Sequence, residues 1–181
     1  GSYIYSGDPE TRNRFRGTAM HNIVMVDGLE INRFLRHRIF GLRKDAVPNI
    51  NKWESKTDYD LLDASESGYE RLLQPIRHSR RFYFDKKNRR LEITDNFIGK
   101  GVHDLEWNFH FAAGILITKE NNKIHAAGKA QNLYISIPKD ITEHAQIKQD
   151  KISPSYGILK DAAVITLKAN RVNLQQQNVF S

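Results

Sequence analysis

The chain has 181 residues, of which 39% are hydrophobic and 27% charged, with a formal net charge of +7. These values are typical of a globular protein that is long enough to bury a sizeable core. The absence of cysteine excludes disulfides and thiolate metal sites, and no apolar run has the length of a membrane span. The positive charge favours an anionic partner, which leaves nucleic acid, lipid headgroups and acidic polysaccharide open.

Apolar and polar residues alternate with a period of two along much of the chain, as in half-buried β-strands. In the clearest case Leu105, Trp107 and Phe109 share one face of a predicted strand. The strand-like stretches, in chain order, are 21–28, 58–72 (strand, then loop), 80–95 (a hairpin turning at 85–88), 103–112, 115–128 (a hairpin turning at 120–123), 132–138 and 162–169.

Helical patterns are scarce. The stretch 29–43 fits either a turn or two of helix or an irregular basic loop, and the final residues, 174–181, fit a frayed end or a last edge strand. The basic stretch 77–81, RHSRR, is interpreted as an exposed entry to a strand. Short strands joined by polar turns, without a linker-like segment, predict an all-β protein: an antiparallel two-sheet β-sandwich forming a single domain over 1–181.

The seven histidines contain no closely spaced pair of the kind that binds a metal. They are His21, His37, His78, His103, His110, His125 and His144. A metal site would therefore combine residues from several strands or from outside this chain. His110 lies on the polar face of its predicted strand, and a half-exposed histidine bonded to a neighbour is favoured there over a catalytic one.

His21 stands at the start of a predicted strand. It shares a face with Ile23 and Met25, and because both faces of this strand are apolar, we expect His21 at or near its buried entrance. A buried imidazole needs a partner for each ring nitrogen, and a metal ion is one such partner. From the residues alone, a core histidine bonded to the backbone is favoured over a metal ligand.

Three arginines precede this strand. Arg12, Arg14 and Arg16 alternate, so in an extended segment they would project from one side and bind carboxylates or sulfates of an acidic sugar chain. The alternative is a solvated edge that deters aggregation. Just upstream, the phenols of Tyr3 and Tyr5 are suited to stack on a sugar or to transfer a proton.

The stretch from Tyr3 to Gly28, YxYxGDPExRNRFRGTAxHNxVxVDG, resembles the signature of the heparinase II/III-like family of bacterial polysaccharide lyases. The similarity is to the C-terminal β-sandwich domain of that family. It continues through HSRRFYFDK (78–86) and ITDNFIGKGVHDLEWNFHFA (93–112), which follow in the expected order, so it covers essentially the whole chain.

The resemblance implies a larger periplasmic or secreted enzyme whose N-terminal α-helical toroid supplies most catalytic groups, while the sandwich closes the cleft. Its substrate would be a uronate polysaccharide, such as a glycosaminoglycan or alginate, cleaved by β-elimination. A base removes the C5 proton, the neutralised carboxylate stabilises the anion, and an acid protonates the departing O4. The fragment alone is expected to be inactive.

The resemblance also implies a metal site. In relatives the sandwich holds zinc through two histidines and an aspartate, and His21 matches one of these ligands. The other two ligands lie upstream of the point where this chain begins, so we expect zinc in the full-length protein and weak or no binding by the fragment. A tyrosine in or beside the active site of relatives is matched best by Tyr5 and next by Tyr3.

Two other functions remain possible from the sequence. The first is a non-catalytic carbohydrate-binding or structural sandwich, because a fold alone does not establish turnover. The second, a nucleic-acid binder, is disfavoured because the basic residues surround no aromatic stacking platform or recognition helix.

Overall fold

A computed structural model describes residues 2–36, 38–138, 141, 145–175 and 178–181. Contacts within the chain define two compact units, Gly1–Arg43 with Asp104–Asn170 and Lys44–His103 with Arg171–Ser181. Among the described residues, 54% lie in strands and 7% in helices. The strand pairs are antiparallel. The predicted fold class, an all-β protein of the antiparallel sandwich type, is confirmed.

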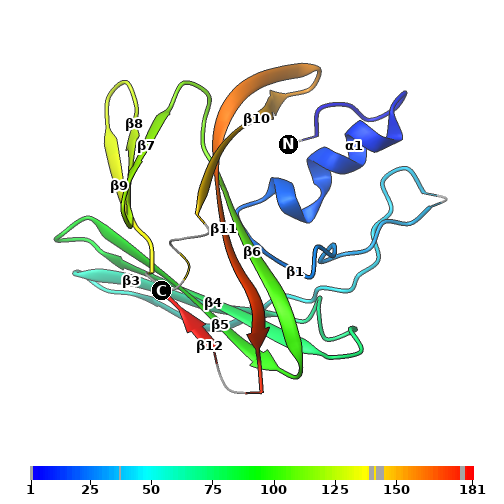
Figure 1. Cartoon of the computed structure of the whole chain (residues 1–181), viewed down its shortest axis with the longest axis horizontal. Helices are drawn as coiled ribbons and strands as arrows, with labels where there is room; N and C mark the ends of the chain where they lie inside the picture. The colour runs from blue at the N-terminus through cyan, green and yellow to red at the C-terminus, as the bar shows by residue number, and fades with distance from the viewer. Residues whose placement is uncertain (1, 37, 139–140, 142–144, 176–177) are drawn as a thin grey trace. The chain divides into compact units, whose positions relative to one another are not determined.

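The first unit contains a four-stranded sheet in the order β1-β6-β11-β10 and a three-stranded sheet in the order β7-β8-β9 (Figure 1). Its elements are α1 (Pro9–Arg16), the 3-10 helix η1 (Thr18–Met20), β1 (Val24–Val26), most of β6 (Val102–His110), β7 (Leu116–Glu120), β8 (Lys123–Ala127), β9 (Asn132–Ser136), β10 (Gln146–Ser155) and most of β11 (Ile158–Asn173).

The core of the four-stranded sheet lies along β6 and β11. In β6 the predicted alternation holds, since Leu105 and Trp107 are buried while Asp104 is exposed. In β11 the six consecutive residues 162–167 are all buried, because this strand is interior to its sheet and is covered on both faces. Both predicted strands are therefore confirmed, and β11 is longer than the stretch 162–169.

The predicted hairpin at 115–128 is confirmed as the pair β7–β8. Glu120 pairs with Lys123, which leaves Asn121 and Asn122 as a two-residue turn. Asn121 has a φ of 52°, a left-handed conformation that asparagine tolerates better than most residues. The polar turn residues thus set the register of this hairpin.

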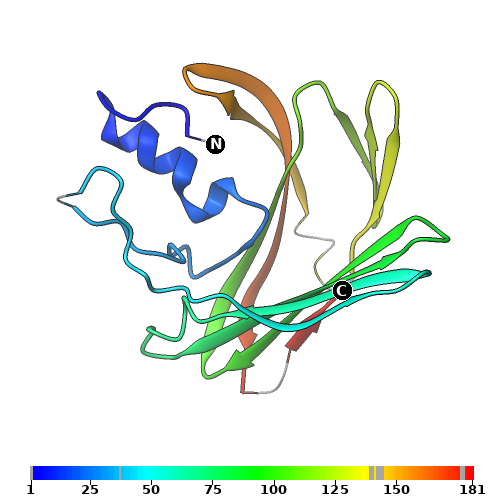
Figure 2. The same cartoon turned by 180° about the vertical axis from the view of Figure 1, so that it is seen from behind.

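The second unit forms a five-stranded sheet in the order β12-β5-β4-β3-β2 (Figure 2). Its strands are β2 (Asn49–Ser55), β3 (Tyr59–Glu66), β4 (Ile76–Asp85), β5 (Arg90–Gly99) and β12 (Asn178–Phe180). The predicted hairpin at 80–95 is the pair β4–β5, whose turn is held by Asp85, which accepts the backbone N–H of Asn88 at 2.9 Å. The last residues form an edge strand, one of the two forms predicted.

Two strands were not predicted, β2 and β10. Their sequences, NINKWES and QIKQDKISPS, are mostly polar, and most of their residues are exposed. Each is the last strand in its sheet, where one edge has no strand neighbour. Because few apolar residues mark a buried face in such strands, the period of two does not show in the sequence.

Residues 9–16 form a helix, so the prediction of an extended segment there is wrong. Asp8 caps α1 by accepting the backbone N–H of Thr11 at 3.0 Å, Pro9 occupies its first turn, and Glu10 adds a favourable negative charge. Residues 29–36 and 38–43 form an irregular loop, one of the two forms predicted for this stretch. Among the described residues, no helix combines the length and the apolar character needed to cross a bilayer.

Candidate functional site

A pocket of about 350 Å³ opens in the first unit. It is lined by Arg14, Gly17, Ala19, Met20, Glu30, Glu106, Asn108, His110, Lys148, Gln149, Asp150, Val164 and Thr166. These residues come from α1, η1, β6, β10 and β11 and from the loop after β1. Nine of these thirteen residues have polar or charged side chains, although apolar atoms supply the larger part of the lining surface, and the volume lies in the range of small-molecule sites.

His110 has one ring nitrogen engaged and one without a partner. Its Nε2 lies 2.8 Å from the carbonyl oxygen of Ala19, and because a carbonyl only accepts, Nε2 carries the hydrogen. Its Nδ1 is buried and has no hydrogen-bond partner. The backbone N–H of His110 is held by the Oδ1 of Asn22 at 2.8 Å. The side chain is half-buried and bonded to a neighbour, as predicted.

A chain of hydrogen bonds joins three of the residues that line the pocket, Thr166, Asn108 and Glu106. Thr166, which is 3% exposed, donates from Oγ1 to Oδ1 of Asn108 at 3.0 Å, and Asn108 donates to Oε1 of Glu106 at 3.0 Å. Lys168 pairs with the other oxygen of Glu106 at 2.8 Å. Burial raises the pKa of Glu106, but the hydrogen bonds from Lys168 and Asn108, together with the charges of Lys168 and Lys148, bring it below its ordinary value.

The three arginines lie on α1 and do not form the expected row. Arg12 is buried and donates to the carbonyl oxygen of Tyr5 at 3.3 Å. Arg16 donates to the carbonyl oxygen of Ile39 at 2.7 Å, which fastens the irregular loop to the helix. Arg14 alone borders the pocket, where it pairs with Asp150 of β10. A direct contact between Arg12, Arg14 or Arg16 and a substrate stays a prediction.

His21 is exposed and ends η1, so its predicted placement in the buried entrance of a strand is wrong. The strand begins only at Val24. Nearby protein atoms still remove part of the imidazole from water, which lowers the pKa of His21; the charge of His110 acts in the same direction and that of Glu30 opposes it. Its neutral form therefore predominates at neutral pH, and this is the form that binds metals.

Zinc needs more ligands than His21. Within the part of the chain that the structure describes, no group of three or more His, Cys, Asp or Glu side chains is arranged to hold a metal ion. A structural zinc site has four ligands, and a catalytic site has three protein ligands. The described residues therefore do not form a zinc site by themselves.

Tyr5 and Tyr3 lie apart from the pocket lining. The ring of Tyr5 is 50% exposed and packs against Tyr156 and Phe40, with centroid distances of 4.9 Å and 5.6 Å. Tyr3 is half-buried and packs on Phe15, with a centroid distance of 5.8 Å. Tyr5 is thus the more accessible of the two phenols, and its catalytic role stays a prediction.

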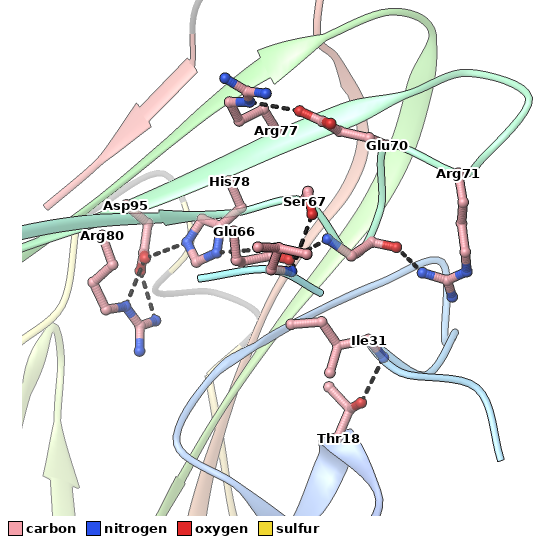
Figure 3. Close-up of polar contacts among 12 residues, drawn as sticks. Thr18, Ile31, Glu66, Ser67, Glu70, Arg71, Arg77, His78, Arg80 and Asp95 are labelled. Atoms are coloured by element: carbon pink, nitrogen blue, oxygen red, sulfur yellow. Dashed lines mark hydrogen bonds and ion pairs between the residues drawn. The ribbon is translucent and has the colours of Figure 1, made fainter. Parts of the chain in front are cut away.

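The sequence interpretation missed a buried polar cluster in the second unit (Figure 3). Nε2 of His78 lies 2.7 Å from Oδ1 of Asp95, and Arg80 binds both oxygens of Asp95 at 2.7 Å and 2.8 Å. All three side chains are buried, so the interpretation of 77–81 as an exposed strand entry is wrong at His78 and Arg80. The ring of His78 stacks on Phe97, with a centroid distance of 4.8 Å.

Two carboxylates flank His78 and differ in pKa. Burial raises the pKa of Asp95, but the hydrogen bonds from His78 and Arg80 outweigh it and bring the value to about 2. Burial also raises the pKa of Glu66, and here the raising effect prevails. Oε1 of Glu66 lies 3.8 Å from Nδ1 of His78 (Figure 3). This cluster is closed off from solvent, and we interpret it as structural.

The remaining histidines have local partners or fall outside the description. Nε2 of His103 lies 2.9 Å from the carbonyl oxygen of Lys100, and His125 stacks on Tyr134, with a centroid distance of 4.7 Å. His37 and His144 lie outside the described residues. The pocket with His110 is therefore the strongest candidate site of the described chain.

Comparisons with known proteins identify the family. The sequence profile described as "Heparinase II/III-like, C-terminal" matches residues 1–179. The fold is similar to that of heparan sulfate lyase HepC from Pedobacter heparinus, with a TM-score of 0.77 and 20% identity over 99% of this chain. It is also similar to a heparinase III, the BT4657 gene product, with a TM-score of 0.74 and 18% identity over 99% of this chain.

The chain spans 26% of the length of each of these two structures. No curated protein sequence matches it. Identities this low establish the fold alone, whereas the profile match over nearly every residue establishes the family. The chain therefore belongs to the heparinase II/III-like family, as a C-terminal domain of that family.

Proposed function

We propose that this chain is the C-terminal domain of a polysaccharide lyase that cleaves a uronate-containing polysaccharide by β-elimination. The observation that carries the proposal is the family match over residues 1–179. The similarity to a heparan sulfate lyase makes heparan sulfate the first polymer to test, with alginate as an unsulfated uronate polymer for comparison.

The reaction breaks the C5–H and C4–O4 bonds of the uronate and forms a C4–C5 double bond, while a proton reaches O4. In our proposal most groups that move protons belong to an N-terminal α-helical domain of the same protein, and this chain closes the other side of the substrate cleft. Tyr5 is its best candidate for a group near the reacting sugar, because its phenol is half exposed. By itself the chain is expected to be inactive.

The zinc site is part of the same proposal. His21 would supply one ligand, and the other ligands would come from residues that the described structure does not contain. The test is metal analysis of the purified full-length protein, with stoichiometric zinc expected in the wild type and a marked loss in His21→Ala. Equal zinc in both proteins would refute the role of His21. A periplasmic or secreted location, proposed from the family, is tested by fractionating cells of the source bacterium.

The lyase proposal is tested with the full-length protein on heparan sulfate, chondroitin sulfate and alginate, by following the ultraviolet absorbance of the unsaturated uronate product. We expect absorbance to rise on at least one polymer. Tyr5→Phe, which keeps the ring packing and removes the hydroxyl, is expected to lower kcat, whereas the matched variant Tyr3→Phe keeps it. No product on any polymer would count against the lyase and favour the second candidate, a carbohydrate-binding module, whose supporting observation is the polar pocket.

A further inference from the structure

The irregular loop after β1 contains a short hairpin, which we call the basic finger and which comprises residues 33–36 and 38–43. An antiparallel bridge between Phe34 and Leu42 closes it. Beside this bridge the backbone N–H of Arg43 donates to the carbonyl oxygen of Arg33 at 2.8 Å. The finger therefore has a defined register although the loop around it is irregular.

The finger concentrates positive charge. It carries four arginines and no acidic residue, and all four side chains are exposed: Arg33, Arg36, Arg38 and Arg43. The formal net charge of the whole chain is +7, so these four residues account for more than half of it. A charge concentrated in this way attracts anions to one part of the surface.

Three of these guanidinium groups have no carboxylate partner. No carboxylate in the described part of the chain forms an ion pair with Arg36, Arg38 or Arg43. The arginines of α1 differ, because each of them has a partner within the chain. Guanidinium groups bind anionic oxygens through paired, charge-assisted hydrogen bonds. The finger therefore offers three such groups to an anion from outside the chain.

Helix α1 holds the finger in place. Arg16 donates to the carbonyl oxygens of Ile39 and Phe40 at 2.7 Å and 3.2 Å, and its guanidinium carbon lies 5.2 Å from the ring centroid of Phe34. One side chain thus contacts both strands of the hairpin's far half and its base, and the finger lies beside the helix (Figures 1 and 2). A surface that is fixed before the ligand arrives loses less entropy on binding.

The finger also lies beside Tyr5. The ring of Phe40 packs edge-on against the ring of Tyr5, with a centroid distance of 5.6 Å, and Tyr156 packs on Tyr5 at 4.9 Å. These three rings are 63%, 50% and 58% exposed, in the order Phe40, Tyr5 and Tyr156. Their exposed surface is apolar enough to pack against the C–H groups of a sugar ring. Anion-binding and ring-binding groups are therefore neighbours here.

We propose that the basic finger binds the anionic groups, carboxylate or sulfate, of a polysaccharide chain that runs beside Tyr5. The class of polymer rests on the proposed function, whereas the binding of anions rests on the charges and contacts of the finger. The finger would then hold sugar units next to the one that is cleaved, so it acts in substrate affinity and moves no proton.

The test is fluorescence anisotropy of the 181-residue chain with labelled heparan sulfate, dextran sulfate, alginate and a DNA duplex, compared at equal concentrations of negative charge. We expect at least one polysaccharide to bind more tightly than the DNA. Binding of dextran sulfate identifies sulfate as the group that is bound, and binding of alginate identifies carboxylate. The double variant Arg36→Gln with Arg38→Gln is expected to weaken binding at least about tenfold and to reduce the salt dependence by about two charges.

The matched control is Lys87→Gln with Arg90→Gln, which removes two exposed positive charges from the β4–β5 hairpin and should change the affinity by less than about twofold. Equal weakening by the two double variants would show that binding follows net charge alone and would overturn the proposal. Tighter binding of DNA than of every polysaccharide, or no binding of any polysaccharide, would overturn it as well.

Kinetics of the full-length protein separate this inference from the proposed function. Loss of ground-state binding contacts raises KM and leaves kcat unchanged, so this is the result expected for the finger variant. A full-length protein that binds these polymers and cleaves none refutes the proposed function alone. A protein that cleaves with an unchanged KM after the finger substitutions refutes the role of the finger alone.

Discussion

Replacing Asp95 by asparagine removes the charge at the centre of the buried cluster in the second unit. Asp95 is 3% exposed and receives hydrogen bonds from His78 and Arg80. The fall of its pKa from 3.8 to about 2 corresponds to about 2 kcal/mol of stability at neutral pH. The asparagine also removes the carboxylate that pairs with the buried guanidinium of Arg80, and breaking a buried pair in this way typically costs about 3–5 kcal/mol.

We therefore expect Asp95→Asn to lower the free energy of unfolding by about 3 kcal/mol, a large share of the total of a typical domain. The assay is urea denaturation of the 181-residue chain at pH 7, followed by tryptophan fluorescence and circular dichroism. The matched control is Asp161→Asn, which breaks the exposed pair with Lys151 at 2.6 Å and should cost under about 1 kcal/mol. Equal losses of unfolding free energy in the two variants would refute the inference that burial makes the Asp95 ion pair stabilise the protein more than an exposed pair does.

Three further predictions concern single sites. Because the pKa of Asp95 is lowered on folding, its contribution to stability is complete above pH 3.8 and disappears as the pH falls toward about 2. The difference in urea midpoint between wild type and Asp95→Asn should therefore shrink over this range. A constant difference would contradict the assignment. Asp8→Ala removes the cap of α1 and should cost about 1 kcal/mol in urea denaturation, whereas an unchanged midpoint would mean that the cap is dispensable. Phe97→Ala, at a fully buried ring that stacks on His78, should cost about 3–5 kcal/mol, and a loss under about 1 kcal/mol would show that this core is loosely packed.

The strands with clear alternation were predictable because burial of one face leaves a period of two in the sequence. The stretch 103–112 and the hairpins at 80–95 and 115–128 are of this kind. Helix α1 was missed although its start has a recognisable signal, since Asp8, Pro9 and Glu10 form an N-cap, a first-turn proline and an acidic first turn. Arginines at alternate positions are equally typical of an extended segment, so this spacing competes with the capping pattern.

The buried cluster of His78, Arg80 and Asp95 could be predicted in part from the sequence. Once the turn pairs Asp85 with Arg90, the antiparallel register places Arg80 directly opposite Asp95. An opposite-charge pair across the strands follows from the sequence on this basis. Its burial does not, because charged residues are rarely buried and nothing local marks this exception.

The pocket could not be predicted because its lining comes from segments far apart in the chain. Arg14 on α1 meets Asp150 on β10, and His110 on β6 meets Ala19 in η1. Only the tertiary structure brings these groups together. Neither contact has a local sequence pattern that would indicate it.

In our proposal the full-length protein containing this chain cleaves its substrate by elimination. The most direct measurement is mass spectrometry of the products after digestion of heparan sulfate in water enriched in the heavy oxygen isotope. Elimination incorporates no solvent oxygen at the cleaved bond and leaves an unsaturated uronate at the new non-reducing end, which is the result that we predict. Products that carry one solvent oxygen per cleavage and no double bond would show hydrolysis and contradict the account.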